Sequence, residues 1–203
     1  MHKPFVQACE NNKHAIAEAL QSYLRNVRTI LEIGSGTGQH IVHFASCFPH
    51  ITWQASDLKE NHAGINAWIR DSKLPNVNSP IEFDLEAVGA PVHNTSLRAV
   101  DAVYSANVVH IIETRLISRL FLRASEVLTE TGLVFMYGPF NYEKRFTSEG
   151  NRRLDAWLKS QHPDFGIRDF EYVDEIARTH GLSLMDDLTM PANNRLLVWR
   201  TLA

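Results

Sequence analysis

Cysteine is scarce in this chain of 203 residues, which contains only Cys9 and Cys47. The two do not stand at the short spacing of a metal-binding pair, and they are too few for a disulfide framework. No hydrophobic run approaches the ~20 apolar residues of a transmembrane helix. The first residues, Met1 to Phe5, lack the apolar core of a signal peptide. We therefore expect a cytoplasmic protein with no membrane signal.

An excess of positive charge is also missing. Lys and Arg number 20 against 23 Asp and Glu, which gives a formal net charge of −3. Proteins that bind nucleic acid without specificity need a basic footprint, so this balance favours a small-molecule partner over nucleic acid. Internal repeats, low-complexity segments and linkers are lacking too. With 44% hydrophobic residues, we expect one domain over residues 1–203.

What the sequence does contain is a strand, a glycine turn and a helix in succession. Residues 27–33 are apolar and β-branched, as in a buried parallel strand. Gly34, Gly36 and Gly38 follow at alternate positions, and an amphipathic helical pattern begins near Gly38. Glycine allows positive φ and lets a ligand approach the backbone without meeting a Cβ atom. This unit typically opens a nucleotide-binding α/β fold.

The spacing of the glycines argues against a dinucleotide. That fingerprint requires Gly-x-Gly-x-x-Gly, and Gln39 stands where its third glycine belongs. Glu32 precedes the turn by two residues. A carboxylate repels a pyrophosphate and attracts a cation such as an amino acid's ammonium group. The turn therefore favours a cationic ligand.

Two further acids follow expected strands. Asp57 ends a strand over residues 51–56, about 20 residues after Gly38, where an acid accepts hydrogen bonds from ribose hydroxyls. Its alternative role is a helix N-cap. Asp84 ends a short strand over residues 81–84, and its alternative role is to start the next loop.

Asn107 and His110 follow a strand over residues 99–105 and so reach the carboxyl edge of the sheet, where ligands of open α/β sheets bind. Imidazole titrates near neutrality, so His110 is a candidate general base. The alternative is a histidine packed against the strand at residues 133–137. Residues 138–148, rich in aromatic and charged side chains, are either a candidate substrate loop or a surface loop.

The remaining pattern predicts helices and strands along the whole chain. Residues 1–26 are expected to form an irregular arm up to residue 11 and then a helix over 12–25, with Asn11 as its cap. A long helix begins near Leu116 and closes near Gly132. Residues 85–98 form a weakly patterned connection. The last two strands, 182–188 and 195–201, must be antiparallel because their connection is too short for a crossover.

Glu32-x-Gly34-x-Gly36-x-Gly38 resembles the first motif of the class I S-adenosylmethionine (SAM) methyltransferases. Within that class, Glu10-Asn11-Asn12-Lys13, Phe165 to Asp169 and Met190 to Asn194 resemble signatures of a small methyltransferase-like family of unknown function. Asn11 departs from the arginine of that family. The resemblance implies a Rossmann-like α/β sheet of seven strands in the order 3-2-1-4-5-7-6, with an antiparallel strand 7 and helices on both faces.

The resemblance also implies SAM as cofactor and S-adenosylhomocysteine as product. The implied cofactor-binding residues are Glu32, Gly34, Ser35, Gly36, Gly38, Asp57, Leu58, Asp84, Leu85 and Asn107. Candidate substrate-binding residues are Asn12, Lys13, Tyr137, Phe140 and Tyr142, with His110 as the candidate catalytic residue. His40 and His43 share a helix, but no third ligand accompanies them, so we expect no metal.

The predicted function is SAM-dependent methyl transfer to an unidentified small-molecule acceptor. No Asn-Pro-Pro-Tyr motif follows the fourth strand, which argues against a base amine or glutamine amide as acceptor. One alternative is a non-catalytic SAM-binding or scaffold protein. Another is a nicotinamide-dependent reductase, opposed by Glu32, Gln39 and the lack of a Tyr-x-x-x-Lys pair.

Overall fold

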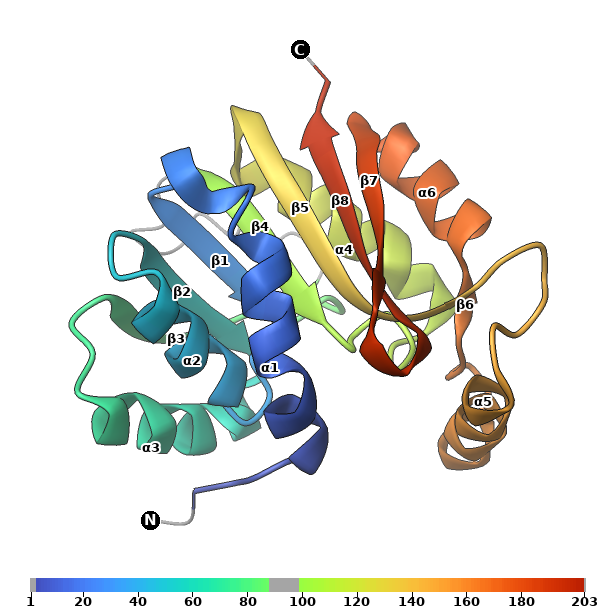
Figure 1. The fold of residues 1–203 in the computed structure, drawn as a ribbon, viewed down its shortest axis with the longest axis horizontal. Coiled ribbons are helices and arrows are strands. Elements are labelled where there is room, and N and C mark those ends of the chain that lie inside the picture. Colours follow the sequence, from blue (N-terminus) through green and yellow to red (C-terminus); the bar gives the residue numbers. More distant parts are fainter. Residues whose placement is uncertain (1–2, 88–98, 203) are drawn as a thin grey trace. The chain divides into compact units, whose positions relative to one another are not determined.

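The computed structural model of the protein describes residues 3–87 and 99–202 (Figure 1). The strands pair in the order β3-β2-β1-β4-β5-β8-β7, and a short strand, β6, pairs with β5. This order confirms the predicted class I methyltransferase fold, with β6 as one strand more than expected. The predicted connection at 85–98 lies outside the described residues from 88 onward. The chain divides into two compact units between Ser105 and Ala106.

The first unit is built on parallel strands and the helices between them. Its elements are α1 (Gln7–Leu20), η1 (Leu24–Asn26), β1 (Thr29–Ile33), α2 (Gln39–Cys47), β2 (Thr52–Asp57), η2 (Lys59–Asn61), α3 (His62–Ser72), β3 (Val77–Glu82) and β4 (Val100–Ala106). In the register of β1 with β2, Ile33 lies opposite Ser56, so the two strands end side by side. Gly34, which follows β1, and Asp57, the last residue of β2, therefore emerge at one edge of this sheet.

Aromatic rings fill the core of the first unit. The Phe44 ring lies 5.7 Å from that of Trp53 and 5.2 Å from that of Tyr104, all three fully buried. Helix α2 contacts both α1 and α3. A Cβ atom on Gly38 would lie 3.0 Å from the backbone Cα of Ile65, so only glycine allows α3 to pack this closely against the start of α2.

The second unit contains an antiparallel ribbon and three helices. Its elements are α4 (Thr114–Val127), β5 (Leu128–Asn141), α5 (Glu149–Gln161), β6 (Arg168–Asp169), α6 (Phe170–Thr179), β7 (Leu182–Met190), η4 (Pro191–Asn193) and β8 (Asn194–Thr201). β8 pairs antiparallel with both β5 and β7, which confirms the predicted orientation of the last two strands. The buried Trp199 of β8 packs edge-on against Phe121 of α4 and donates a 2.9 Å hydrogen bond to Asp174 of α6.

The predicted N-terminal arm is wrong. Helix α1 begins at Gln7 rather than residue 12, and its N-cap position is Val6, so Asn11 lies inside the helix. The Val6 N–H donates a 2.6 Å hydrogen bond to the side-chain oxygen of Gln39. Because that acceptor comes from another helix, no local capping signal in the sequence marks this start.

The predicted limits of the fifth strand are also wrong. β5 starts at Leu128, includes Gly132 and continues through Gly138 and Pro139, where a break was expected. In the register, Pro139 lies opposite Asn194 of β8, and the next residue, Phe140, pairs with β6. The candidate substrate loop is therefore strand up to residue 141, and only residues 142–148 remain outside β5.

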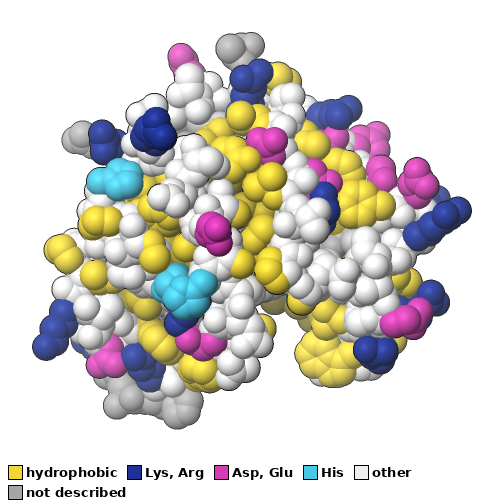
Figure 2. Space-filling view, in the orientation of Figure 1, with side chains coloured by type: hydrophobic (Ala, Val, Ile, Leu, Met, Phe, Trp, Pro, Cys, Tyr) yellow, Lys and Arg dark blue, Asp and Glu magenta, His cyan; other side chains and the backbone are white. Residues whose placement is uncertain are grey.

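Charged side chains on the face shown in Figure 2 are scattered, with Lys and Arg set among Asp and Glu rather than gathered in one field. Among the described residues, every helix is too short or too polar to cross a bilayer.

Replacing Gly38 with alanine should destabilise the protein more than the same change at Gly181. Both have positive φ, 88° and 76°, which disfavours a side chain by ~1–2 kcal/mol. Only at Gly38 would the added Cβ atom also lie against backbone atoms, so overpacking of ~1–3 kcal/mol adds to the loss of folding stability there. Urea unfolding of G38A and G181A measures the difference, and equal losses would contradict this account of the α2–α3 contact.

Candidate functional site

The glycine turn at the end of β1 is held by backbone hydrogen bonds to β2. The N–H groups of Gly34 and Ser35 both donate to the carbonyl of Ser56, at 3.1 and 3.0 Å. The turn closes where the Gly38 N–H donates to the Ser35 carbonyl at 2.8 Å. Gly34, Gly36 and Gly38 have φ of 75°, 57° and 88°, so each uses the left-handed region that glycine favours.

Gly36 forms the exposed tip of this turn. A Cβ atom placed on it would meet no atom within 4 Å, so the space above the tip is open. Beneath it, the Gly36 N–H donates a 2.6 Å hydrogen bond to Oδ2 of Asp57. The tip thus offers a ligand bare backbone with an acid beside it.

Asp57 is buried at the end of β2 with both carboxylate oxygens engaged. Oδ1 accepts from the Leu58 N–H and from Nδ2 of Asn61, each at 2.7 Å, and Oδ2 accepts from Gly36. An ionised carboxylate offers about four acceptor sites, so one remains on Oδ2. Leu58, and not Asp57, occupies the N-cap position of η2, where no side-chain cap bond forms. Asp57 therefore keeps the capacity to accept one ligand hydroxyl.

Glu32 lies behind the turn and is only 2% exposed. Burial raises the pKa of its carboxyl from 4.5 to about 8, the Ser35 hydrogen bond opposes this, and the Asp57 charge adds to it. Among the described residues, its Oε2 has no hydrogen-bond partner. An unpaired buried carboxyl oxygen is unfavourable unless a donor reaches it. This oxygen suits the ammonium group of a ligand.

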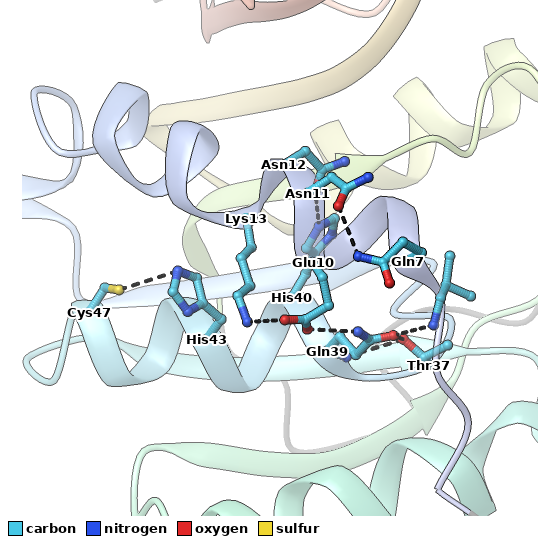
Figure 3. Close-up of polar contacts among 11 residues, drawn as sticks. Gln7, Glu10, Asn11, Asn12, Lys13, Thr37, Gln39, His40, His43 and Cys47 are labelled. Carbon is cyan, nitrogen blue, oxygen red and sulfur yellow. Dashed lines mark hydrogen bonds and ion pairs between the residues drawn. The ribbon is translucent and has the colours of Figure 1, made fainter. Parts of the chain in front are cut away.

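Side chains of α1 clamp the start of α2 (Figure 3). Nε2 of Gln39 donates to Oε1 of Glu10 at 2.8 Å, while Oε1 of Gln39 accepts from the Thr37 hydroxyl at 3.0 Å and from the Val6 N–H. Lys13 pairs with the other oxygen of Glu10. We call these five residues the α1–α2 clamp. It ties α1 to the last residues of the glycine turn.

The predicted substrate residues Asn12 and Lys13 both have protein partners. The Asn12 side-chain oxygen lies 2.7 Å from Nε2 of His40, and Lys13 belongs to the clamp. Burial lowers the pKa of His40 to about 4, so its ring is neutral and donates to Asn12. His43 instead lies edge-on to His14, with 4.6 Å between ring centroids.

Cys9 and Gln39 are two residues of this region that sequence reasoning missed. Burial and the charge of Glu32 raise the pKa of the Cys9 thiol to about 11, and a hydrogen bond with Thr37 opposes the rise. Cys9 therefore belongs to the low-dielectric surroundings of Glu32. The motif from Glu10 to Lys13 was the sequence signal that could have found them, because Cys9 precedes it on α1 and Gln39 bonds its Glu10.

Asp84 and Leu85 follow β3 in a turn. Oδ1 of Asp84 accepts from the Glu86 N–H at 2.8 Å, which leaves Oδ2 available to a donor. Leu85 is partly buried, whereas Leu58 after β2 is 40% exposed. An exposed leucine beside an acid is compatible with a planar, apolar ligand group.

In the second unit, Asn107 and His110 meet at Gly138. A Cβ atom on Gly138 would lie 3.6 Å from Oδ1 of Asn107 and 3.7 Å from Nδ1 of His110. Asn107 has a φ of 60°, and its N–H donates to the Tyr137 carbonyl at 2.8 Å. The absence of a side chain at Gly138 thus leaves room beside two polar side chains.

His110 is a buried, neutral imidazole. Burial, and then the charge of Arg168, lower its pKa to about 4. Among the described residues, Nδ1 has no hydrogen-bond partner. Arg168 holds the segment by donating to the carbonyls of Val109 at 3.1 Å and Ile112 at 2.7 Å. The site keeps an unprotonated nitrogen at neutral pH, although its basicity is low.

The three predicted aromatic substrate residues have different surroundings. Tyr137 and Phe140 are 1% and 0% exposed, so their rings lie in the core of the second unit. Tyr142 is half-buried, stacks on Phe170 at 5.3 Å and donates to Oδ2 of Asp187 at 2.8 Å. Only Tyr142 of the three presents a ring beyond the core.

The chain belongs to the family described as "Protein of unknown function (DUF938)", whose profile matches residues 3–201. This is the family to which the three sequence signatures pointed.

Solved structures of similar fold are methyltransferases. Human N-acetylserotonin methyltransferase in complex with SAM is 15% identical, with a TM-score of 0.81 over 97% of this chain and 53% of its own. An O-methyltransferase family 2 protein from Planctomyces limnophilus, in complex with apigenin, is 14% identical, with a TM-score of 0.80 over 97% of this chain and 58% of its own. An O-methyltransferase family protein from Burkholderia thailandensis is 15% identical, with a TM-score of 0.76 over 94% and 58%.

At these identities the likeness establishes the class I methyltransferase fold. The chain spans little more than half of each of these proteins, between 53% and 58% of their length.

Replacing Glu32 with glutamine should stabilise the ligand-free protein at neutral pH. The folded pKa of about 8 exceeds the ordinary value of 4.5, so the folded state retains a proton that the unfolded state loses. Stability of the wild type therefore falls as pH rises from 4.5 to 8, by up to ~1.4 kcal/mol per pH unit.

We expect E32Q to exceed the wild type by ~1–3 kcal/mol at pH 7, and by much less near pH 4, in urea unfolding. E18Q, at an exposed position of α1, is the matched control and should show no such pH dependence. A wild-type stability that rises with pH relative to E32Q would contradict the buried, protonated carboxyl.

Proposed function

We propose that the protein binds SAM at the glycine turn of the first unit and transfers its methyl group to a small-molecule acceptor. The observation that carries this proposal is the buried Glu32 carboxyl, with one oxygen unpartnered behind three glycines of positive φ. A turn of bare backbone with an acid behind it suits a ligand that is both bulky and cationic. SAM, with its ammonium and sulfonium groups, is such a ligand.

Each predicted cofactor residue of the first unit has a role consistent with this ligand. Glu32 would receive the ammonium group, and the open tip at Gly36 would lie against the methionine and ribose portions. The remaining acceptor site of Asp57 suits a ribose hydroxyl, and Asp84 suits the adenine amino group. Leu58 would pack on the adenine. The human enzyme of similar fold was solved in complex with SAM, which supports SAM as the ligand.

When bound, SAM would supply a methyl group on a sulfonium, with the thioether of S-adenosylhomocysteine as the leaving group. The residues of the chain then have to position the acceptor and accept a proton from it. Neutral His110 has the lone pair for that second task. Asn107, which also lies beside Gly138, offers an amide to the cofactor or to the acceptor. Because the pKa of His110 is about 4, we assign most of the rate enhancement to positioning.

The acceptor class follows from charge and from the similar structures. Lys and Arg are scattered on the face shown in Figure 2, and the chain carries a net charge of −3, which gives no field to attract nucleic acid. The protein from Planctomyces limnophilus of similar fold was crystallised with apigenin, a small molecule. Both observations support a small-molecule acceptor.

Titration calorimetry should detect binding of SAM and S-adenosylhomocysteine but not NAD. Gly36→Val should abolish binding, because its side chain would occupy the open space at the tip. Gly181→Val is the matched control, since Gly181 also has positive φ and open space around its Cβ position. Circular dichroism verifies the fold of both variants.

Binding of NAD without either sulfur compound would overturn the proposal. Retained SAM affinity in folded G36V would remove the turn from the binding site. SAM binding without turnover would leave a non-catalytic SAM-binding protein, the remaining alternative.

His110→Ala should lower turnover with little change in SAM affinity. A screen of metabolites with labelled SAM identifies the acceptor, and the same label then measures the rate. Loss of a general base lowers rates by roughly 10²–10⁴-fold, and the low pKa of His110 places the expected loss at the lower end. His180→Ala, in the same unit, is the control. Methylation of protein or RNA with none among metabolites would refute the acceptor class.

A further inference from the structure

The second unit contains a pocket of about 290 Å³ between the end of β5 and the β7–β8 hairpin. Its lining residues are Tyr142, Thr147, Thr189, Asn193, Asn194 and Arg195. We propose that this pocket binds the carboxylate of a small organic acid. The proposal goes beyond the proposed function, because it concerns a site formed within the second unit alone.

Arg195 supplies the positive charge and is held rigidly. Its Nε donates to Oδ1 of Asp187 at 2.6 Å, one Nη donates to the Asp187 carbonyl at 2.9 Å, and the other donates to the Thr189 hydroxyl. A guanidinium has five N–H donors, so two remain for a ligand. Asp187 also accepts from the Tyr142 hydroxyl, which fixes the pair in place.

Among the other lining groups, the two threonines retain free donors, whereas the Tyr142 hydroxyl donates to Asp187 and one Asn194 amide N–H donates to the Pro191 carbonyl. The Thr189 oxygen accepts from Arg195, and the Thr147 oxygen accepts from Asn151 at 2.9 Å, so each hydroxyl retains its own O–H to donate. Asn193 adds an exposed side-chain amide at the rim. None of the lining residues is acidic. Two hydroxyl donors and an amide around one cation fit a ligand with acceptor atoms and a negative charge.

The small positive charge of the pocket favours a ligand with a single negative charge. Arg195 is the cation of the lining, and Asp187 already neutralises much of it through the 2.6 Å ion pair. A doubly charged phosphate would find too little compensation here, whereas a carboxylate needs only one charge and two or three donors.

Backbone strain in both flanking turns indicates a preformed site. Glu143 and Lys144 have φ of 49° and 60°, and Ala192 and Asn193 have φ of 58° and 57°. Such conformations are unfavourable for side chains and cluster at binding sites, where the surrounding structure enforces them. The first turn is closed by two backbone hydrogen bonds between Tyr142 and Arg145. Asn151 holds the second, because its Nδ2 bonds both Thr147 and the Asn193 carbonyl.

Fluorine NMR with para-fluorobenzoate and its neutral analogue para-fluorobenzamide tests the pocket. We expect saturable line broadening of the acid by the wild type and at least ~10-fold weaker binding of the amide, as for loss of a charge-assisted hydrogen bond. Arg195→Gln should weaken binding of the acid to the level of the amide. Arg200→Gln, which removes the same charge from an exposed position of β8, should bind like the wild type.

Two milder variants keep the test independent of folding. Thr189→Val removes a hydroxyl with little change of shape, and Asn193→Gly removes the amide while allowing the positive φ. Each should weaken binding of the acid several-fold with an unchanged circular dichroism spectrum. Equal binding of acid and amide, no saturable binding of the acid, or wild-type affinity in all three pocket variants would overturn the proposal.

SAM titration of the same samples separates the two proposals. R195Q should bind SAM like the wild type. Acid binding that depends on Arg195, in a protein that binds no SAM, would refute the proposed function and leave the pocket assignment standing. SAM binding without acid binding would refute the pocket assignment and leave the proposed function standing.

Discussion

The burial of the Glu32 carboxyl is the constraint on which the first unit depends. Removing a carboxyl group from water is unfavourable, and here the protein meets that penalty by keeping the group protonated near neutrality. The surroundings are arranged to tolerate it: Ser35 bonds the carboxyl, and the Ser56 hydroxyl donates to the Glu32 carbonyl at 2.6 Å. A group that destabilises the ligand-free protein is readily explained if a bound ligand gives it a cationic partner.

The attachment of α1 follows from the same arrangement. Cys9 shares the low-dielectric surroundings of Glu32, so α1 must cover this side of the turn for the carboxyl to stay buried. The α1–α2 clamp provides the attachment through Glu10 and Gln39. Thr37 of the clamp belongs to the glycine turn itself. The position of α1 and the shape of the turn are therefore coupled through two hydrogen bonds, from Gln39 to Glu10 and from Thr37 to Gln39.

Local patterns in the sequence sufficed for the glycine turn and the antiparallel hairpin, because apolar runs and glycine spacing are local signals. The strand order came from the family resemblance. The start of α1 at Gln7 could not be predicted, since its cap acceptor comes from Gln39 on another helix. The extension of β5 past Gly138-Pro139 depends on pairing with β8 and β6, which are distant in sequence. The ion pair of Arg195 with Asp187 likewise exists only once β7 and β8 are paired.

Each unit contains a polar group whose binding capacity the described residues do not use up. The first keeps a buried carboxyl for which the described residues offer no cation, and the second keeps an arginine with two N–H donors beyond those that bond Asp187 and Thr189. A bound SAM would supply the missing cation in the first, and an organic acid the missing anion in the second. The two contacts differ in kind, because SAM would bring a net positive charge to a carboxyl, whereas the acid would bring one negative charge to the donors of Arg195. A charge-assisted contact at Arg195 favours acids over neutral or cationic ligands of the pocket, whatever ring or chain carries the carboxylate.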